Sequence, residues 1–363
     1  MNNYILPYTL AQLQRITHLF QKEIILSKQN KKTSLSYFSY PLPHTHTCSE
    51  PFQSMIVGGS VFEKAIIKKT GKQITILNLT KSHVPLFTNK EVFLRFIHSH
   101  IELSVLYIAI NFTYPSQPVI INNIIDGRLC SGTKGHAFIG LIGKNVGEEL
   151  SDYVRKKSGK HILFTLANDT ICLLLAGMKN ISTIIAGGVV GTGMNFGFFD
   201  GKHLINLESG NFSAFPQTET GKQVDKQSNN PGLQLFEKEV SGKYLFKHFN
   251  LISKQKNIPL SLSSTSNLHD LALDNNDLPS HIAQSLFERS ASLAACQIAG
   301  IYHFLNQKQL EFIMEGTVFW TGWNFKSMVE KYLILLGIPQ EAVQFTKIEH
   351  SNILGAAKLV TGI

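Results

Sequence analysis

The stretch "HILFTLANDTICLLLAG", residues 161–177, contains the step on which the fold depends. An apolar strand is expected to end near Ala167, and an apolar helix is expected to begin after Asn168 and Asp169. A strand that runs into a helix is the building unit of α/β folds, and ligands gather at the carboxyl ends of their strands. The two polar residues therefore either cap the helix or serve a binding site, and this stretch alone leaves both possibilities open.

The same mixture of strands and helices continues on both sides. Segments rich in β-branched residues and turn glycines predict strands within 54–71, 73–81, 104–115 and 117–125. Helices are expected over 10–20 and 143–159, with Gly159 ending the second, and again from about residue 230 onward. Residues 182–199 predict two strands joined by a Gly-Thr-Gly turn. Strands followed by helices, twice over, predict an α/β chain of two domains, residues 1–167 and 168–363.

Composition limits the class of protein. The chain has 363 residues, 43% of them apolar and 16% charged, which is enough to bury a core. Its four cysteines (Cys48, Cys130, Cys172 and Cys296) lie far apart, so they fit a reduced, cytoplasmic chain better than a disulfide framework or a zinc site. The N-terminus has no pattern of a secretory signal, and no apolar run reaches the length of a membrane span.

The net charge of +9 could indicate nucleic acid, a membrane surface or a phosphorylated ligand. The lysines are spread out, so nucleic-acid binding is not expected, and a nucleotide phosphate or simple solubility explains the charge as well. His44 and His46 have the spacing of one strand face, but they have no partner ligands nearby and are interpreted as part of a surface loop rather than a metal site.

Several short pieces hold polar residues where chemistry could occur. Lys134 stands in "SGTKGHAF", residues 131–138, between Gly132 and Gly135, where a solvated lysine would need no glycine. Gly191, Thr192 and Gly193 could form an ordinary hairpin turn or could bring backbone N–H groups to a phosphate. Glu208 and Glu237, each considered alone, are more typical of a solvated surface. The stretch "FTYP", residues 112–115, supplies Thr113 at the end of a predicted strand.

Taken in order, these pieces resemble the hexokinase family over nearly the whole chain. "FTYP" is similar to the family's F-S-F-P, "DGRLCSGTKGHAF" to D-G-x-L-x-x-W-T-K-G-F, "NDT" to its catalytic tripeptide, "GTGMN" to its phosphate hairpin and "NLESGNF" to N-x-E-W-G-x-F. The longest and most specific match is "VDKQSNNPGLQLFEKEVSGKYL", residues 224–245. The spacing from Glu315 of "EGTVF" to Ala357 of "GAA" is similar to the family's C-terminal nucleotide segment. One motif would be weak, but seven in order are specific.

The resemblance implies two actin-like ATPase domains, which are ribonuclease H-like, around a cleft that closes on a sugar. It implies an ATP- and Mg²⁺-dependent hexokinase of glycolysis that phosphorylates the 6-hydroxyl of a hexose, with glucose as the expected substrate. Asp169 would accept the proton of the attacking hydroxyl, and Lys134 would offset charge on the transferring phosphoryl group. The implied sugar-binding residues are Thr113, Thr133, Lys134, Asn168, Asp169, Asn195, Glu208 and Glu237. The implied nucleotide-binding residues are Gly58, Gly59, Ser60, Gly191, Thr192, Gly193, Gly316, Thr317 and Gly355.

The chain departs from the family in the small-domain phosphate loop. Where the family has D-L-G-G-T-N-F-R, this chain has "IVGGSVFEK", so that Ile56 replaces the aspartate near magnesium, Val61 the asparagine and Glu63 the arginine. No residue of the chain is therefore predicted as a metal ligand. Lys64 follows Glu63, but on a strand it points to the opposite face unless a bulge intervenes. Gly132, His136 and Ser209 replace a tryptophan, a phenylalanine and another tryptophan.

The retained sugar-binding motifs and the altered phosphate loop are together compatible with two functions. The first is an active hexose kinase, and the second is a sugar-binding pseudokinase or regulator that keeps the sugar pocket without turnover. Both predict hexose as a ligand; only the first requires productive binding of ATP. The choice of hexose, the phosphoryl donor, the oligomeric state and the regulation stay open from the sequence.

Overall fold

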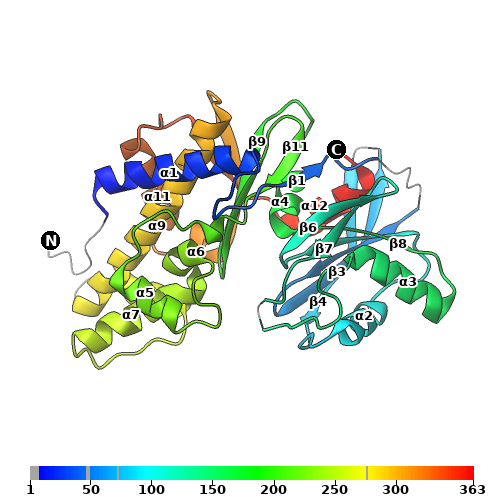
Figure 1. Cartoon of the computed structure of the whole chain (residues 1–363), viewed down its shortest axis with the longest axis horizontal. Coiled ribbons are helices and arrows are strands. Elements are labelled where there is room, and N and C mark those ends of the chain that lie inside the picture. The colour runs from blue at the N-terminus through cyan, green and yellow to red at the C-terminus, as the bar shows by residue number, and fades with distance from the viewer. Residues whose placement is uncertain (1–7, 46–49, 72, 134, 275–276) are drawn as a thin grey trace. The chain divides into compact units, whose positions relative to one another are not determined.

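A computed structural model describes residues 8–45, 50–71, 73–133, 135–274 and 277–363, and the chain forms two compact units (Figure 1). Unit 1 comprises Met1–Tyr37, Ala186–Phe198 and Asn206–Lys347, and unit 2 comprises Phe38–Ile185, Phe199–Ile205 and Ile348–Ile363. The fold is mixed α/β, as the alternation of strand and helix patterns predicts.

The elements of unit 2 are β1 (Phe38–Pro41), β2 (Phe52–Val57), β3 (Val61–Thr70), β4 (Gln73–His83), α2 (Lys90–His98), β5 (Tyr107–Phe112), β6 (Ser116–Ile121), β7 (Ile124–Leu129), α3 (Val146–Ser158), β8 (Leu163–Ala167), α4 (Asp169–Gly177), β11 (His203–Asn206) and α12 (Ser351–Thr361). Those of unit 1 are α1 (Leu10–Lys28), β9 (Ile185–Val190), β10 (Met194–Phe199), the 3₁₀ helix η1 (Ser209–Asn211), α5 (Glu219–Lys226), α6 (Leu235–Val240), α7 (Gly242–Gln255), α8 (Thr265–Leu273), α9 (Leu278–Leu305), β12 (Leu310–Glu315), α10 (Thr317–Thr321), α11 (Phe325–Leu335) and β13 (Val343–Thr346). Three strands cross a unit boundary by one residue. Ile185 of β9 and Phe199 of β10 fall in unit 2, and Asn206, the last residue of β11, falls in unit 1.

Unit 2 is organised around a five-stranded sheet of order β4-β3-β2-β5-β8. β2 and β5 are parallel neighbours, as are β5 and β8, whereas β3 pairs antiparallel with both β2 and β4. The core between one face of the sheet and the helices α2 and α3 is apolar and rich in aromatic residues, as Phe62, Phe93 and Phe112 illustrate. Helix α12 contacts β2, β5 and α4, and the Ser54 hydroxyl of β2 donates to the Ile353 carbonyl at 3.0 Å. The carboxyl ends of three parallel strands therefore meet at one edge.

Unit 1 contains the strand sequence β10-β9-β12-β13, in which β9 and β10 form an antiparallel hairpin and β12 and β13 are parallel. Its longest helix, α9, packs against α1 (Figure 1). Gly300 of α9 allows this approach, because a Cβ there would lie 2.8 Å from the Phe20 ring. The buried face of α1 includes Leu13, Ile16 and Phe20, which the three- and four-residue spacing predicts.

The expected elements that carry the motifs are present. Helix α3 ends at Gly159, which adopts φ 70°, and the predicted hairpin is formed by β9 and β10. The short strands β12 and β13 and the helix α2 were not predicted from the sequence. His44 lies in an exposed loop after β1, as expected, whereas His46 and Cys48 lie outside the described residues.

The two units do not follow a single boundary after residue 167. The N-terminal helix α1 belongs to unit 1 because it packs on α9, and the C-terminal helix α12 belongs to unit 2 because it packs on β2, β5 and α4. The prediction that residues 1–167 and 168–363 form the halves of a hexokinase-like small and large domain stays a prediction. In the described part of the chain, no helix is long and apolar enough to cross a membrane.

Candidate active site

The sheet of unit 2 places three predicted segments at one edge. Gly58 follows β2, Thr113 follows the neighbouring strand β5, and Asn168 and Asp169 follow β8, which is the next strand of the sheet. These strands are parallel and in register, so their carboxyl ends lie together. This edge is the place where α/β sheets bind ligands.

Asp169 is the first residue of α4, and Asn168 is its N-cap. The Asn168 Oδ1 accepts a hydrogen bond from the Ile171 N–H at 3.1 Å, so the capping interpretation of Asn168 is correct. The Asp169 Oδ1 accepts from the Asn168 amide at 2.9 Å and from the Thr170 N–H at 2.8 Å. Its Oδ2 accepts no hydrogen bond from the described residues. One carboxylate oxygen is therefore fixed by hydrogen bonds to neighbouring residues, and the other is not bound to the described residues.

The two threonines predicted to bind sugar differ in their contacts. The Thr113 hydroxyl donates to the Val57 carbonyl at 3.3 Å, which ties the end of β5 to the end of β2. The Thr133 Oγ1 is buried and has no hydrogen-bond partner among the described residues. A buried hydroxyl without a partner is costly, so it favours a ligand contact at this position. Lys134, the residue next to it, lies outside the described residues.

The charges around the phosphate loop of unit 2 differ from those of the family it resembles. Ile56 of β2 and Glu63 of β3 are directly opposite each other, so they share one face of the sheet. Glu63 forms an ion pair with Lys81 of β4 at 3.0 Å. The Lys64 ammonium donates to the His100 carbonyl at 3.0 Å, as expected for a side chain on the opposite face. Lys64 is thereby committed elsewhere, and Glu63 is partly neutralised.

In unit 1, Asn195, Asn206, Glu208 and Ser209 form a hydrogen-bonded set that we call the Asn206 network. The Asn195 amide donates to the Asn206 Oδ1 at 2.7 Å, and the Asn206 amide donates to the Glu208 Oε1 at 2.8 Å. The Asn195 Oδ1 accepts from the Ser209 N–H at 3.0 Å. Asn206 is fully buried, whereas Asn195 and Glu208 are half-buried. Glu208 itself has a left-handed backbone, with φ 49°, a strained conformation that is common at functional sites.

Glu237 lies close to the hairpin in the same unit. Its Oε2 accepts a hydrogen bond from the Met194 N–H at 3.0 Å, and a Cβ on Gly193 would lie 2.8 Å from that oxygen. Glu237 is in the first turn of α6, where a negative charge is favourable. Burial, followed by the charge of Glu237, raises the pKa of Tyr244 to about 12. The glutamate therefore sits among polar groups and is not a solvated surface residue.

Two buried ion pairs hold the segment that carries Glu237. The Lys238 ammonium, with no exposed surface, contacts Asp225 at 2.5 Å and the Asn230 carbonyl at 2.8 Å. Glu239 pairs with Arg289 at 3.2 Å, and both are buried. Breaking such a pair leaves an uncompensated charge inside the protein, so the pairs fix the position of α6. The long motif contained these residues, but their partners are distant in sequence and could not be assigned from it.

The predicted nucleotide segments of unit 1 meet at their glycines. A Cβ on Gly316 would lie 2.2 Å from the Val190 carbonyl, and one on Gly191 would lie 3.1 Å from the Gly316 Cα. The N-terminus of α7 joins them, since the Gly242 N–H donates to the Gly191 carbonyl at 2.7 Å and the Lys243 N–H donates to the Thr192 carbonyl at 3.2 Å. Thr192 and Thr317 are exposed beside this close backbone packing. The sequence did not predict that α7 would support the hairpin.

Gly355 has a structural explanation in unit 2. A Cβ there would lie 1.7 Å from the Cys172 carbonyl, so only glycine lets α12 pack this closely on α4. Three residues further along α12, the Lys358 ammonium donates to the Met178 carbonyl at 2.6 Å at the end of α4, and burial lowers the pKa of Lys358 to about 8. The role of Gly355 in nucleotide binding stays a prediction.

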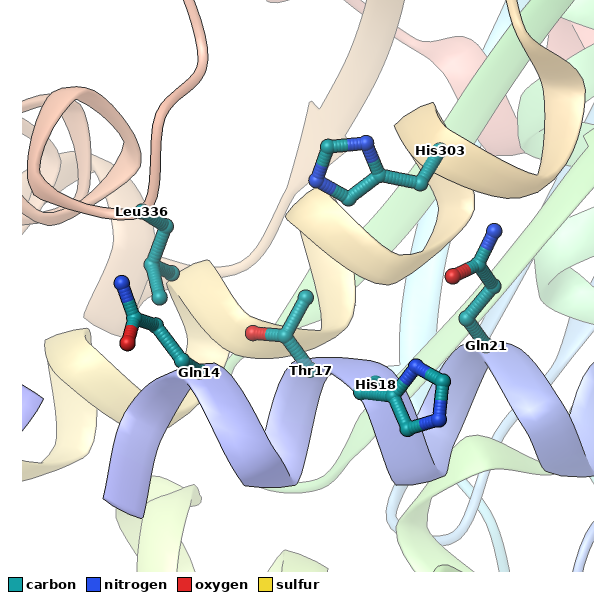
Figure 2. Close-up of a pocket in the computed structure, with 6 residues that line it drawn as sticks. All are labelled: Gln14, Thr17, His18, Gln21, His303 and Leu336. Carbon is teal, nitrogen blue, oxygen red and sulfur yellow. The ribbon is translucent and has the colours of Figure 1, made fainter. Parts of the chain in front are cut away.

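A pocket of about 380 Å³ lies elsewhere in unit 1 (Figure 2). Figure 2 shows its lining along α1, with His303 projecting from α9 and Leu336 from the end of α11. The described site residues do not line it. In the described part of the chain, no cluster of three or more His, Cys, Asp or Glu side chains could hold a metal ion. The pocket lining is Gln14, Thr17, His18, Gln21, His303 and Leu336.

Comparisons with known proteins extend these observations. A family model described as "Hexokinase" matches residues 197–256 and 251–361. Hexokinase-9 of Oryza sativa subsp. japonica is 34% identical over 153 residues, which cover 38% of this chain and 30% of the relative. Hexokinase-2 of Candida albicans is 29% identical over 216 residues, covering 52% of this chain and 44% of the relative. The matches thus span only 30% and 44% of the length of these two relatives.

The fold likeness covers nearly the whole chain. A hexokinase from Schistosoma mansoni complexed with glucose superimposes with a TM-score of 0.77 at 19% identity, covering 97% of this chain and 95% of the other. A second crystal structure of a hexokinase gives 0.79 at 18% identity, covering 99% and 96%. A glucokinase of the ROK family from Streptomyces griseus, in complex with glucose and AMPPNP, gives 0.55 at 15% identity, covering 86% and 99%.

The mixed α/β chain has the two-domain fold of the sugar kinases. More narrowly, the resemblance of its motifs to the hexokinase family is confirmed by the family model, which matches within residues 197–361, and by the curated relatives.

Proposed function

We propose that this protein is an ATP-dependent hexose kinase that transfers the γ-phosphoryl group to the 6-hydroxyl of a hexose such as glucose. The observation that supports it most is the Asn206 network, in which two predicted sugar-binding residues, Asn195 and Glu208, are linked through one buried amide. A sugar is a ring of hydroxyls, so its site needs fixed donors and acceptors, and these residues supply both. Glu237 adds a second carboxylate in the same unit.

Asp169 performs the proton transfer in this proposal. Its Oδ2 accepts the proton of the 6-hydroxyl while the hydroxyl oxygen forms a bond to the γ-phosphorus. The bond from that phosphorus to the β–γ bridging oxygen breaks, and ADP leaves with the electron pair. The hydrogen bonds from Asn168 and Thr170 to Oδ1 hold the carboxylate in place during this step. Lys134 would offset charge on the transferring group.

The residues of unit 2 do not fit a magnesium ion held by the protein at the phosphate loop. Ile56 provides no oxygen ligand, and the carboxylate that shares its face, Glu63, is paired with Lys81. Magnesium prefers oxygen ligands and usually retains waters and substrate phosphates. We therefore assign magnesium to the substrate, as the complex with ATP.

The alternative, a sugar-binding pseudokinase or regulator, is favoured by that same loop. Glu63 stands where the family has an arginine, and the neighbouring Lys64 is bound to the His100 carbonyl, so Lys64 does not replace the cationic contact of that arginine. A lost cationic contact can lower the rate of phosphoryl transfer by roughly a thousandfold. The sugar residues would be retained under both functions.

One assay separates the two functions. ADP release, coupled to an indicator enzyme, is measured with glucose, fructose and mannose in parallel, and hexose binding is measured by calorimetry on the same preparation. Hexose-dependent ADP release supports the kinase. Hexose binding without ADP release supports the pseudokinase, and the absence of both contradicts the sugar site itself.

A further inference from the structure

Two buried side chains hold the turn at residues 58–60, which we call the Gly58 turn. The Tyr114 hydroxyl donates to the Gly58 carbonyl at 2.7 Å, and the His136 Nε2 contacts the Gly59 carbonyl at 2.8 Å. A carbonyl can only accept, so Nε2 must carry the proton. Burial raises the pKa of Tyr114, which keeps its hydroxyl a donor. Both carbonyls of the glycine pair are therefore bound to the protein.

The other nitrogen of His136 is also occupied. Its Nδ1 accepts a hydrogen bond from the Phe87 N–H at 3.0 Å. The ring lies 5.0 Å from the Phe87 ring and 5.5 Å from the Tyr114 ring, measured between centroids, and the residue is only 5% exposed. Only the neutral Nε2–H tautomer satisfies both contacts. A phenylalanine, which the resembled family has here, would fill the space without binding either group.

His136 is also part of the loop that contains Thr133. Its own N–H donates to the Thr133 carbonyl at 2.9 Å, and a Cβ on Gly132 would lie 2.4 Å from the His136 carbonyl. His136 therefore joins the backbone at Thr133 to the Gly58 turn. The amide groups of Gly59 and Ser60 make no hydrogen bonds to the described residues, and consecutive amides of that kind attract anions.

We propose that His136 is a positioning residue that holds the Gly58 turn against the loop of Thr133, so that the turn's amides face the phosphates of a nucleotide. The proposal rests on the proposed function for the identity of the anion. It explains how the turn keeps its shape in a chain where Ile56 and Glu63 replace the aspartate and the arginine.

The test compares three substitutions with different remaining contacts. His136→Phe keeps the ring and removes both hydrogen bonds, His136→Asn keeps an acceptor near the Nδ1 position, and His136→Gln keeps a donor near Nε2. Amide hydrogen exchange is measured without any ligand at Gly58 and Val84, whose N–H groups donate to the Val61 and Ser60 carbonyls. We expect roughly tenfold faster exchange in His136→Phe and His136→Asn, the effect of one lost hydrogen bond, and a smaller change in His136→Gln. The amides of unit 1 serve as the internal control.

Binding provides the second measurement. In His136→Phe, the Kd for MgATP should rise by about five- to tenfold, whereas the Kd for glucose should not change. Exchange and MgATP affinity that both stay at the wild-type values would show that His136 only packs the core, and would overturn the proposal. If the turn loosens but the wild type binds no MgATP, the positioning contact stands and the proposed function fails.

The tautomer provides a check that needs no variant. Nitrogen chemical shifts of His136 in the wild-type protein should show a protonated Nε2 and an unprotonated Nδ1. The opposite tautomer would overturn the proposal.

Discussion

The Asn206 network of unit 1 and the Gly58 turn of unit 2 are both held by hydrogen bonds, but they differ in the polar and charged groups that they offer a ligand. In each, backbone or side-chain amide groups near the end of a strand are held by partly buried hydrogen bonds. The network also keeps carboxylates and amides that suit hydroxyl groups. The turn keeps its backbone shape, but Ile56 and Glu63 stand where the family has a metal-linked carboxylate and a cation. The backbone of the Gly58 turn is therefore held in place although the family's charged residues are absent there. We expect hexose binding to be less impaired than binding of MgATP.

The sharpest test of catalysis is Asp169→Asn. The new side chain keeps an Oδ1 acceptor for Asn168 and Thr170 but places an N–H₂ group where Oδ2 accepts the proton. Turnover should fall by about two to four orders of magnitude, with the Kd for hexose changed only severalfold. Steady-state ADP release and calorimetry measure the two quantities. A variant with full activity would remove Asp169 from the mechanism.

The next largest effect is expected on the sugar side. Replacing Glu208 or Glu237 by alanine removes an acceptor for a sugar hydroxyl, which should raise the hexose Kd by about 30-fold, or on the order of 2 kcal/mol. Glu237→Gln is the matched control, because its amide oxygen can still accept from the Met194 N–H. Unchanged hexose affinity in both alanine variants would show that the carboxylates do not touch the sugar.

Local signals explain which parts of this comparison the sequence could predict. The step at Ala167 and Asn168, the stop at Gly159 and the hairpin at residues 191–193 depend on neighbouring residues, so their patterns predicted them. The motifs predict Glu208 and Glu237 as sugar-binding residues, which stays a prediction, and they gave no sign that Asn206 links Asn195 to Glu208. Such a contact depends on the pairing of segments that are distant in sequence.

The ion pair of Glu63 and the boundaries of the two units also depend on contacts between segments that are distant in sequence. A sequence shows that Glu63 is acidic, but it does not show that the register of β3 and β4 places Lys81 opposite. The packing of α12 on α4 and of α1 on α9 likewise joins the two ends of the chain to segments far from them, so a boundary drawn along the sequence could not include them.

Restoring the family residues tests whether charge is what limits the Gly58 turn. In the double variant Ile56→Asp, Glu63→Arg, ATP-dependent turnover should increase at least about tenfold if the wild type is an impaired kinase. Hexose affinity should stay the same, because the Asn206 network is unaltered. Wild-type turnover already at roughly 1–100 per second would contradict the alignment of this loop. If neither the wild type nor the double variant shows ATP-dependent turnover while both still bind hexose, the pseudokinase is favoured.

The smallest effect is expected from the ion pair between Glu63 and Lys81. Lys81 is 67% exposed on its side chain, so the pair is well screened and contributes at most about 1 kcal/mol. Lys81 compensates the negative charge of Glu63 close to the Gly58 turn, and we expect this to matter more for MgATP binding than for stability.

Lys81→Met leaves Glu63 uncompensated, and the Kd for MgATP should therefore rise by up to about fivefold, the equivalent of that energy. The loss should shrink as salt is added, because surface charges are screened within about 10 Å at 0.1 M ionic strength. Glu63→Gln in the Lys81→Met background removes the negative charge as well and should restore the affinity. An unchanged Kd in Lys81→Met at low salt would mean that Glu63 does not act on the nucleotide, and the weakness of the turn would then depend on Ile56 alone.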